Sequence, residues 1–185
     1  MKTSIFSAVL ALAMTAGAAQ ADEVTDTLQS ALEAYEEGDL QYALEELDYA
    51  KQLMLTMKTD ALSGFLPAAP DGWTREVNSE INASLGMMGG GVGAEAEYSG
   101  GGDSITLTIL ADNPMVGAMS AMIGNAAAMG MKVERIGREK FAVQDGTVQG
   151  LIDSRILVKA EGGDMDMMLK LLEEIDYREL GRFGQ

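Results

Sequence analysis

The sequence contains no cysteine and no histidine. Their absence excludes disulfides, thiolate redox chemistry, the common zinc sites and the Ser/His and Cys/His nucleophilic systems, because each of these needs a thiol or an imidazole. Catalysis by carboxylates or by a serine and a lysine stays open in principle, but no spacing in the chain singles out such a pair. We therefore expect a protein without catalytic residues or cofactor, whose stability comes from packing.

Basic residues are scarce. The chain of 185 residues has 13 lysines and arginines and 29 aspartates and glutamates, which gives a net charge of −16. From Asp22 to Lys58 alone there are ten acidic and two basic residues. Such a surface repels nucleic acid and anionic lipid headgroups, so we expect no nucleic-acid partner, and membrane association is disfavoured. An acidic excess is typical of a solvated surface and does not by itself indicate a cation site.

The first 21 residues have the pattern of a secretory signal. Lys2 supplies the positive end, an apolar run extends from Ile5 to Met14, and Ala19-Gln20-Ala21 is a small-x-small cleavage site. Polar residues dilute the segment and it is short for a membrane span. We expect cleavage after Ala21, export to the periplasm, and a net charge of −17 once Lys2 has been removed.

Proline is also scarce, and two of the three prolines lie in one short segment, Phe65–Trp73. The sequence before this segment has helical periodicity and the sequence after it has the period of strands. Pro67 and Pro70 stiffen the segment, so we expect a joint of fixed geometry, with Trp73 at least partly buried. The predicted divisions are a signal peptide (1–21), an acidic helical hairpin (22–62), a hinge (63–73) and an α+β domain (74–185).

Apolar residues recur at three- and four-residue spacing from Val24 to Leu62, which predicts two amphipathic helices. The pattern breaks at Gly38, which suits the end of the first helix, and Asp39, which suits the cap of the second. So tight a connection makes the helices antiparallel. The apolar stripes comprise Leu28, Ala31, Leu32 and Tyr35, and then Leu40, Ala43, Leu44, Leu47, Ala50 and Met54.

This hairpin resembles a single tetratricopeptide-type repeat at Ala31, Tyr35, Gly38-Asp39, Ala43, Leu47 and Ala50. The small residues Ala43 and Ala50 let the two backbones approach, which is the physical reason for that pattern. A single repeat cannot bury its apolar face alone. It must pack on the chain's own second domain, or else bind a partner protein or a second copy through Tyr35, Tyr42, Tyr49 and the neighbouring leucines.

After the hinge, the apolar period of two predicts a strand over 73–81 and a hairpin of strands over 94–99 and 105–110. Asn113 and Pro114 supply a cap and a first-turn proline for a helix that we expect to end at residue 129. Four further strands are predicted over 131–136, 140–144, 147–152 and 155–160, and Asp164 caps a closing helix. The order predicts an α+β fold with an antiparallel sheet of about seven strands and two helices packed on it.

The proline-containing segment Leu66–Trp73, the apolar helix after Ala111-Asp112-Asn113-Pro114 and the closing amphipathic helix together resemble an uncharacterised family of exported proteobacterial proteins. Their general layout is similar to PsbP-like domains. The resemblance implies a non-catalytic accessory or binding module. The motifs that carry it are structural, and they bring no functional residues to this sequence.

The run Gly86–Gly93 is rich in glycine but lacks the lysine and the serine or threonine that complete a phosphate-binding loop. We interpret it as a connection between strands, and its apolar tip, Met87 and Met88, is a candidate contact. Glu95 and Glu97 lie two residues apart and point to one side of a strand, as exposed glutamates on a wet sheet face do.

The segment Pro114–Gly130 has seventeen residues and no charge. A helix that is apolar all round is buried, paired with a partner or in contact with lipid. One stripe can face the sheet, and the N-terminal hairpin is the simplest cover for the other. Membrane-surface association through this helix is an alternative that the net charge opposes.

Methionine is abundant, with twelve residues after the predicted signal. Flexible thioethers fill irregular cores and adaptable binding grooves, which is the simplest interpretation. In an exported protein without histidine, clustered thioethers also suit copper(I), a soft ion. Met115, Met119 and Met122 lie on successive turns of one helix face. We therefore expect a protein that acts through protein contacts, with small-ligand or copper(I) binding beside this helix as the alternative.

Overall fold

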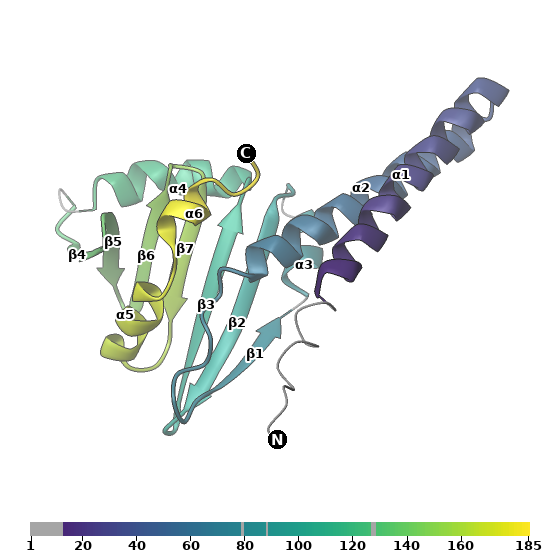
Figure 1. The fold of residues 1–185 in the computed structure, drawn as a ribbon. Coiled ribbons are helices and arrows are strands. Elements are labelled where there is room, and N and C mark those ends of the chain that lie inside the picture. The colour runs from purple at the N-terminus through teal and green to yellow at the C-terminus, as the bar shows by residue number, and fades with distance from the viewer. Residues whose placement is uncertain (1–12, 79, 88, 127–128) are drawn as a thin grey trace, which may run out of the picture. The chain divides into compact units, whose positions relative to one another are not determined.

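A computed structural model of the protein describes residues 13–78, 80–87, 89–126 and 129–185. The chain divides into two compact units between Met57 and Lys58. The first unit contains helix α1 (Ala13–Glu37) and most of helix α2 (Leu40–Ser63), and the second contains the end of α2, a sheet and shorter helices (Figure 1). Residues 1–12 of the predicted signal lie outside the described residues.

Two N-terminal helices follow the predicted periodicity, but α1 begins at Ala13, within the predicted signal, rather than at Val24. The residues expected to separate the two helices do so. Gly38 has a φ of +86°, the left-handed conformation that ends α1. The side chain of Asp39 accepts a hydrogen bond from the backbone N–H of Tyr42 at 3.1 Å and so caps α2. The helices approach through small side chains, and the alanines buried between them are Ala31, Ala34, Ala43 and Ala50.

The second unit is built on one antiparallel sheet of seven strands in the described residues, which confirms the predicted α+β fold. The strand order is β1-β2-β3-β7-β6-β5-β4, so two meanders join where β3 pairs with β7. The strands are β1 (Thr74–Asn78), β2 (Val92–Gly100), β3 (Asp103–Ala111), β4 (Lys132–Ile136), β5 (Glu139–Gln144), β6 (Thr147–Ile152) and β7 (Ile156–Glu161).

Alternate residues of β2, β3, β5, β6 and β7 build the main core on one face of the sheet. Ile109 of β3 and Val158 of β7 are fully buried there. The helices α5 (Met165–Glu173) and α6 (Tyr177–Gly181), drawn in yellow in Figure 1, contribute apolar side chains to the same core. Three residues of α5 are buried against the sheet: Met168, Leu171 and Leu172.

The opposite face of the sheet is covered over only part of its area. Helix α3 (Ile81–Met87) packs on β2 and helix α4 (Pro114–Gly124) packs near β6. Val116 and Ile123 of α4 are buried with Leu157 in a second, smaller apolar cluster. α4 is therefore buried along one stripe. The rest of this face carries polar side chains.

Within the second unit, local structure differs from the sequence expectation at three places. The strand predicted over 73–81 ends at Asn78, because the Asn78 side chain accepts a hydrogen bond from the Glu80 N–H at 2.9 Å and turns the chain into α3. The helix predicted to reach residue 129 ends at Gly124, a helix-stopping residue followed by Asn125 at the cap. Helix α6 is additional, and Asp176 caps it.

The segment predicted as a hinge is bonded to the sheet within the second unit. The buried Tyr98 hydroxyl donates a hydrogen bond to the Pro67 carbonyl at 2.8 Å, and Arg75 Nη1 donates to the same carbonyl at 3.2 Å. Trp73 is partly buried in the main core, and a Cβ added to Gly100 would lie 2.5 Å from its ring. These contacts fix the segment on β2.

A surface ion cluster connects four distant segments of the second unit. Asp112 accepts from Lys58 at 2.9 Å and from Arg155 at 2.8 Å, and Arg155 also donates to the Phe183 carbonyl. Partial burial raises the pKa of Asp112, but the hydrogen bonds from Arg155 and Lys58 outweigh it, so the pKa lies below its ordinary value. The cluster attaches the end of α2 to the corners of the sheet.

Replacing Gly150 by alanine should destabilise the second unit. Phe141 of β5 is fully buried and lies directly opposite Gly150 of β6. The Cβ added at position 150 would lie 2.7 Å from two ring atoms of Phe141. We expect Gly150→Ala to lower the free energy of unfolding by about 1–3 kcal/mol, measured by urea titration with Trp73 fluorescence. Gly117→Ala, which meets no atom within 4 Å, is the matched control. Equal stability of the two variants would contradict the packing described.

Replacing Tyr98 by phenylalanine should change the pH dependence of stability. Burial raises the pKa of Tyr98 to about 12, against a smaller opposite effect of Arg75. Since the unfolded phenol loses its proton first, near pH 10, wild-type stability should fall as the pH rises from about 10 to about 12. In Tyr98→Phe, this part of the decrease in stability with pH should be absent. At neutral pH the variant's free energy of unfolding should be lower than that of the wild type by about 1 kcal/mol, because the hydrogen bond is lost. Urea titrations at pH 8 to 11 test this, and parallel profiles would count against it.

Candidate functional site

The first unit carries an apolar groove along its helical hairpin. Ala31, Ala34, Ala43 and Ala50 are buried, and larger apolar side chains of the same two helices remain at the surface. Together they form a groove of about 430 Å³. Its lining comprises Leu28, Ala31, Leu32 and Tyr35 from α1 and Leu40, Ala43, Leu44 and Leu47 from α2.

The side chains along this groove are exposed to an unusual degree for apolar residues. Leu44 is 60% exposed, Leu40 59% and Tyr35 63%. A contiguous apolar surface of this kind marks an interaction site more often than a solvated face. Glu36 follows Leu32 by one helical turn and Asp48 follows Leu44 by one turn, so exposed carboxylates border the groove on both helices.

The three tyrosines predicted as contact residues occupy different positions. Tyr35 lines the groove. Tyr42 accepts a hydrogen bond from Ser30 at 3.4 Å, and Tyr49 donates one to Glu23 at 2.8 Å, so both connect α2 to α1. That hydrogen bond to the Glu23 carboxylate, followed by the charge of Glu23, raises the pKa of Tyr49. The groove is thus lined mainly by leucines.

Two methionines of α4 lie beside a second cavity. Met115 and Met119 line a cleft of about 290 Å³ next to α3. Met88 and the side chains of Met87 and Met122 lie outside the described part of the structure. Copper(I) binding by three methionines of α4 and a contact at the Met87-Met88 tip therefore stay predictions.

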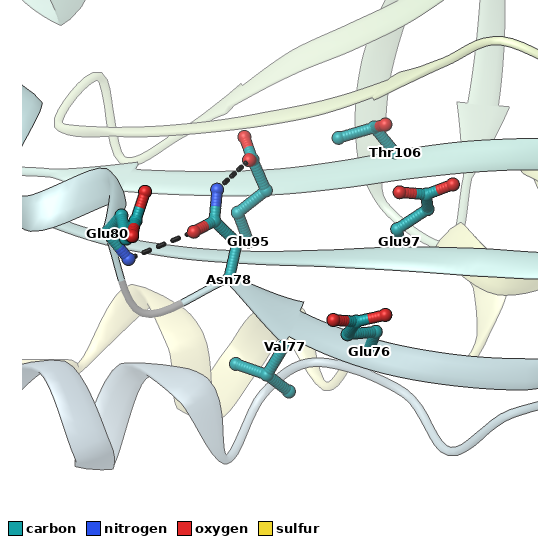
Figure 2. Close-up of a pocket in the computed structure, with 7 residues that line it drawn as sticks. All are labelled: Glu76, Val77, Asn78, Glu80, Glu95, Glu97 and Thr106. Carbon is teal, nitrogen blue, oxygen red and sulfur yellow. Dashed lines mark hydrogen bonds between the residues drawn. The ribbon is translucent and has the colours of Figure 1, made fainter.

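A hollow of about 380 Å³ lies on the open, polar part of the sheet. Figure 2 shows its side chains: Glu95 and Glu97 project from β2 to the same side, and Glu76 of β1 lies directly opposite Glu97 in the strand register. The Asn78 amide donates to Glu95 Oε1 at 2.9 Å, and Ser104 Oγ donates to Glu97 Oε1 at 2.6 Å. The alternation of β2 predicts this shared face of the two glutamates.

These carboxylates do not form a recognisable metal centre. Within the described ranges, no group of three or more histidine, cysteine, aspartate or glutamate side chains is arranged to hold a metal ion. The hollow is lined by Glu76, Val77, Asn78, Glu80, Glu95, Glu97 and Thr106. What it offers is a region of negative charge beside the cleft, with Glu95 lining both cavities.

The comparisons with known proteins add no identification. No protein-family model, no curated protein and no solved structure matches the chain. The resemblance to a tetratricopeptide-type repeat and to PsbP-like domains stays a prediction. None of the helices that the structure describes is long and apolar enough to cross a membrane.

Sequence reasoning missed the residues that close the cleft. Ile81 and Leu85 line the cleft from α3. This short helix is not predicted, because the strand predicted over 73–81 already includes Ile81. The signal that could have revealed α3 is Asn78 followed two residues later by Glu80, the spacing of an Asx turn that ends a strand. Thr108 and Lys159 also line the cleft, and only the pairing of β3 with β7 brings them together.

Proposed function

We propose that this chain is an exported, non-enzymatic binding protein that holds another protein in the apolar groove of its helical hairpin. The observation that carries the proposal is the groove itself, with leucines on both helices about half exposed. Fully burying an exposed leucine side chain stabilises a complex by about 1.5–3 kcal/mol, and completing the burial of a half-exposed one contributes about half of that. Export is supported by the signal-like pattern of residues 1–21.

The shape and chemistry of the groove favour an amphipathic helix as the occupant. A groove between two parallel walls of leucine suits apolar anchors at i, i+3, i+4 and i+7 of a third helix. The rim is acidic at Glu36 and Asp48, and residues 22–57 contain ten acidic residues and one lysine. The partner helix should therefore carry basic residues beside its apolar stripe.

The same charge opposes a second copy as the occupant. Pairing two hairpins groove to groove would bring two strongly acidic surfaces together. Like charges across an interface cost free energy and slow the encounter of the partners. We therefore assign the groove to a different, basic protein rather than to a homodimer.

Two designed peptides test this proposal against residues 22–185 of the protein. Both are amphipathic helices with the same leucine stripe, one flanked by lysines and the other by glutamates. By isothermal titration calorimetry, the lysine peptide should bind with a dissociation constant on the order of micromolar, more weakly as salt is added. The glutamate peptide should not bind. Equal affinity for the two would contradict the assigned partner chemistry.

A pair of leucine variants locates the binding. Leu44→Ser removes an exposed groove residue and should lower the affinity for the lysine peptide about tenfold or more. The free energy of unfolding should change by less than about 0.5 kcal/mol. Leu55→Ser is the matched control, because Leu55 is also exposed on α2 but does not line the groove. An equal loss in both variants would show unspecific apolar contact. Dimerisation of the free protein in light scattering would favour a second copy instead.

A further inference from the structure

The cleft between α3 and α4 is built like a small-molecule site. Its volume of about 290 Å³ is near the lower end of the range for ligand pockets, about 300–1,000 Å³. Apolar side chains come to it from two helices and two strands. The main ones are Ile81 and Leu85 of α3, Met115 and Met119 of α4, Leu110 of β3 and Leu157 of β7.

A short polar row borders the apolar walls of this cleft. Glu95 of β2 lies directly opposite Thr108 of β3, and Thr108 lies directly opposite Lys159 of β7. Residues paired in this way share one face of an antiparallel sheet. All three line the cleft. An apolar chain between the helices could therefore present a polar head to this row.

The Glu95 carboxylate is held in a fixed orientation. Thr108, which is only 4% exposed, donates its hydroxyl to Glu95 Oε2 at 2.8 Å, and the Asn78 amide donates to Oε1 at 2.9 Å. Both donors are neutral, so they orient the carboxylate without cancelling its charge. Each oxygen keeps a further lone pair for a donor from a ligand.

The charges around the row favour a positively charged head. The Lys159 ammonium lies 2.7 Å from the Glu161 carboxylate, so its charge is already matched. Among the described residues, the hydrogen bonds of Glu95 come from neutral groups. Beyond Glu95, the hollow of Figure 2 adds the carboxylates of Glu76 and Glu97. This field attracts a cation and repels an anion.

We propose that the cleft binds a small amine with an apolar chain. The chain lies between α3 and α4, in contact with Met115 and Met119, and the ammonium group donates to the Glu95 carboxylate. Flexible methionine side chains suit such a site because they adapt to chains of different shape. The site belongs to the second unit alone, so it does not depend on the function proposed for the hairpin groove.

Three probes with the same chain test the charge that the cleft selects: octylamine, octanol and octanoate. Each is titrated into the protein labelled with ¹³C at its methionine methyl groups. With octylamine, the NMR signals of Met115 and Met119 should shift, and that of Met168, buried on the opposite face, should not. Octanol should bind about tenfold or more weakly, because it lacks the charged hydrogen bond. Octanoate should not bind.

Three variants identify the residues responsible. Glu95→Gln should lower the affinity for octylamine about tenfold or more. Glu97 lies on the same strand and face but outside the cleft, so Glu97→Gln should change the affinity for octylamine less than about threefold. Ser84→Phe adds a ring at an exposed position in the cleft wall and should abolish binding without loss of thermal stability.

The opposite results would overturn the proposal. If octanoate bound as tightly as octylamine, the cleft would not select a cation, and the octanoate carboxylate would instead pair with the Lys159 ammonium. An absence of shifts at Met115 and Met119 with every probe would show that the cleft is not a ligand site. Octylamine affinity that is the same in wild type, Glu95→Gln and Ser84→Phe would place the amine elsewhere on the acidic surface.

Discussion

Two helices joined by a tight turn can bury only one narrow strip of side chains between them. In this hairpin the buried residues are alanines such as Ala43 and Ala50. Larger residues such as Leu32 and Leu44 stay exposed and line an open groove. In repeat proteins the next repeat covers this surface. Here the leucines stay exposed, which is why we infer that a partner covers them.

In the second unit, the two faces of the sheet are covered by different helices and to different extents. On one face, α5 and α6 complete the main core. On the other, α3 and α4 cover one band of apolar residues and leave acidic rows uncovered. The cleft lies where this band meets the polar row that contains Glu95. The hairpin and this face share a chemistry, because each places apolar side chains next to carboxylates. We infer from this that each suits an amphipathic, basic ligand.

The fold could be predicted where local signals act over a few residues. The caps at Gly38 and Asp39, the Asn113-Pro114 helix start and the strand alternation all have local physical causes, and the structure contains each of them. The groove leucines follow from helical periodicity. The cleft could not be predicted, because it depends on the pairing of β3 with β7 and on α3. Non-local pairing leaves no periodic signal, and a helix of two turns leaves a weak one.

If a partner occupies the groove, the groove wall is accessible in the purified protein and covered in the cell envelope. Because the chain contains no cysteine, Leu44→Cys would place a single thiol at the groove wall, and Leu55→Cys would serve as the reference. Both would be labelled with a maleimide in the purified protein and in the intact cell envelope. We expect rapid labelling of both purified variants, and selective protection of the groove thiol in the envelope. A groove thiol that is slow to react in the purified monomer, or equally reactive in both settings, would contradict it.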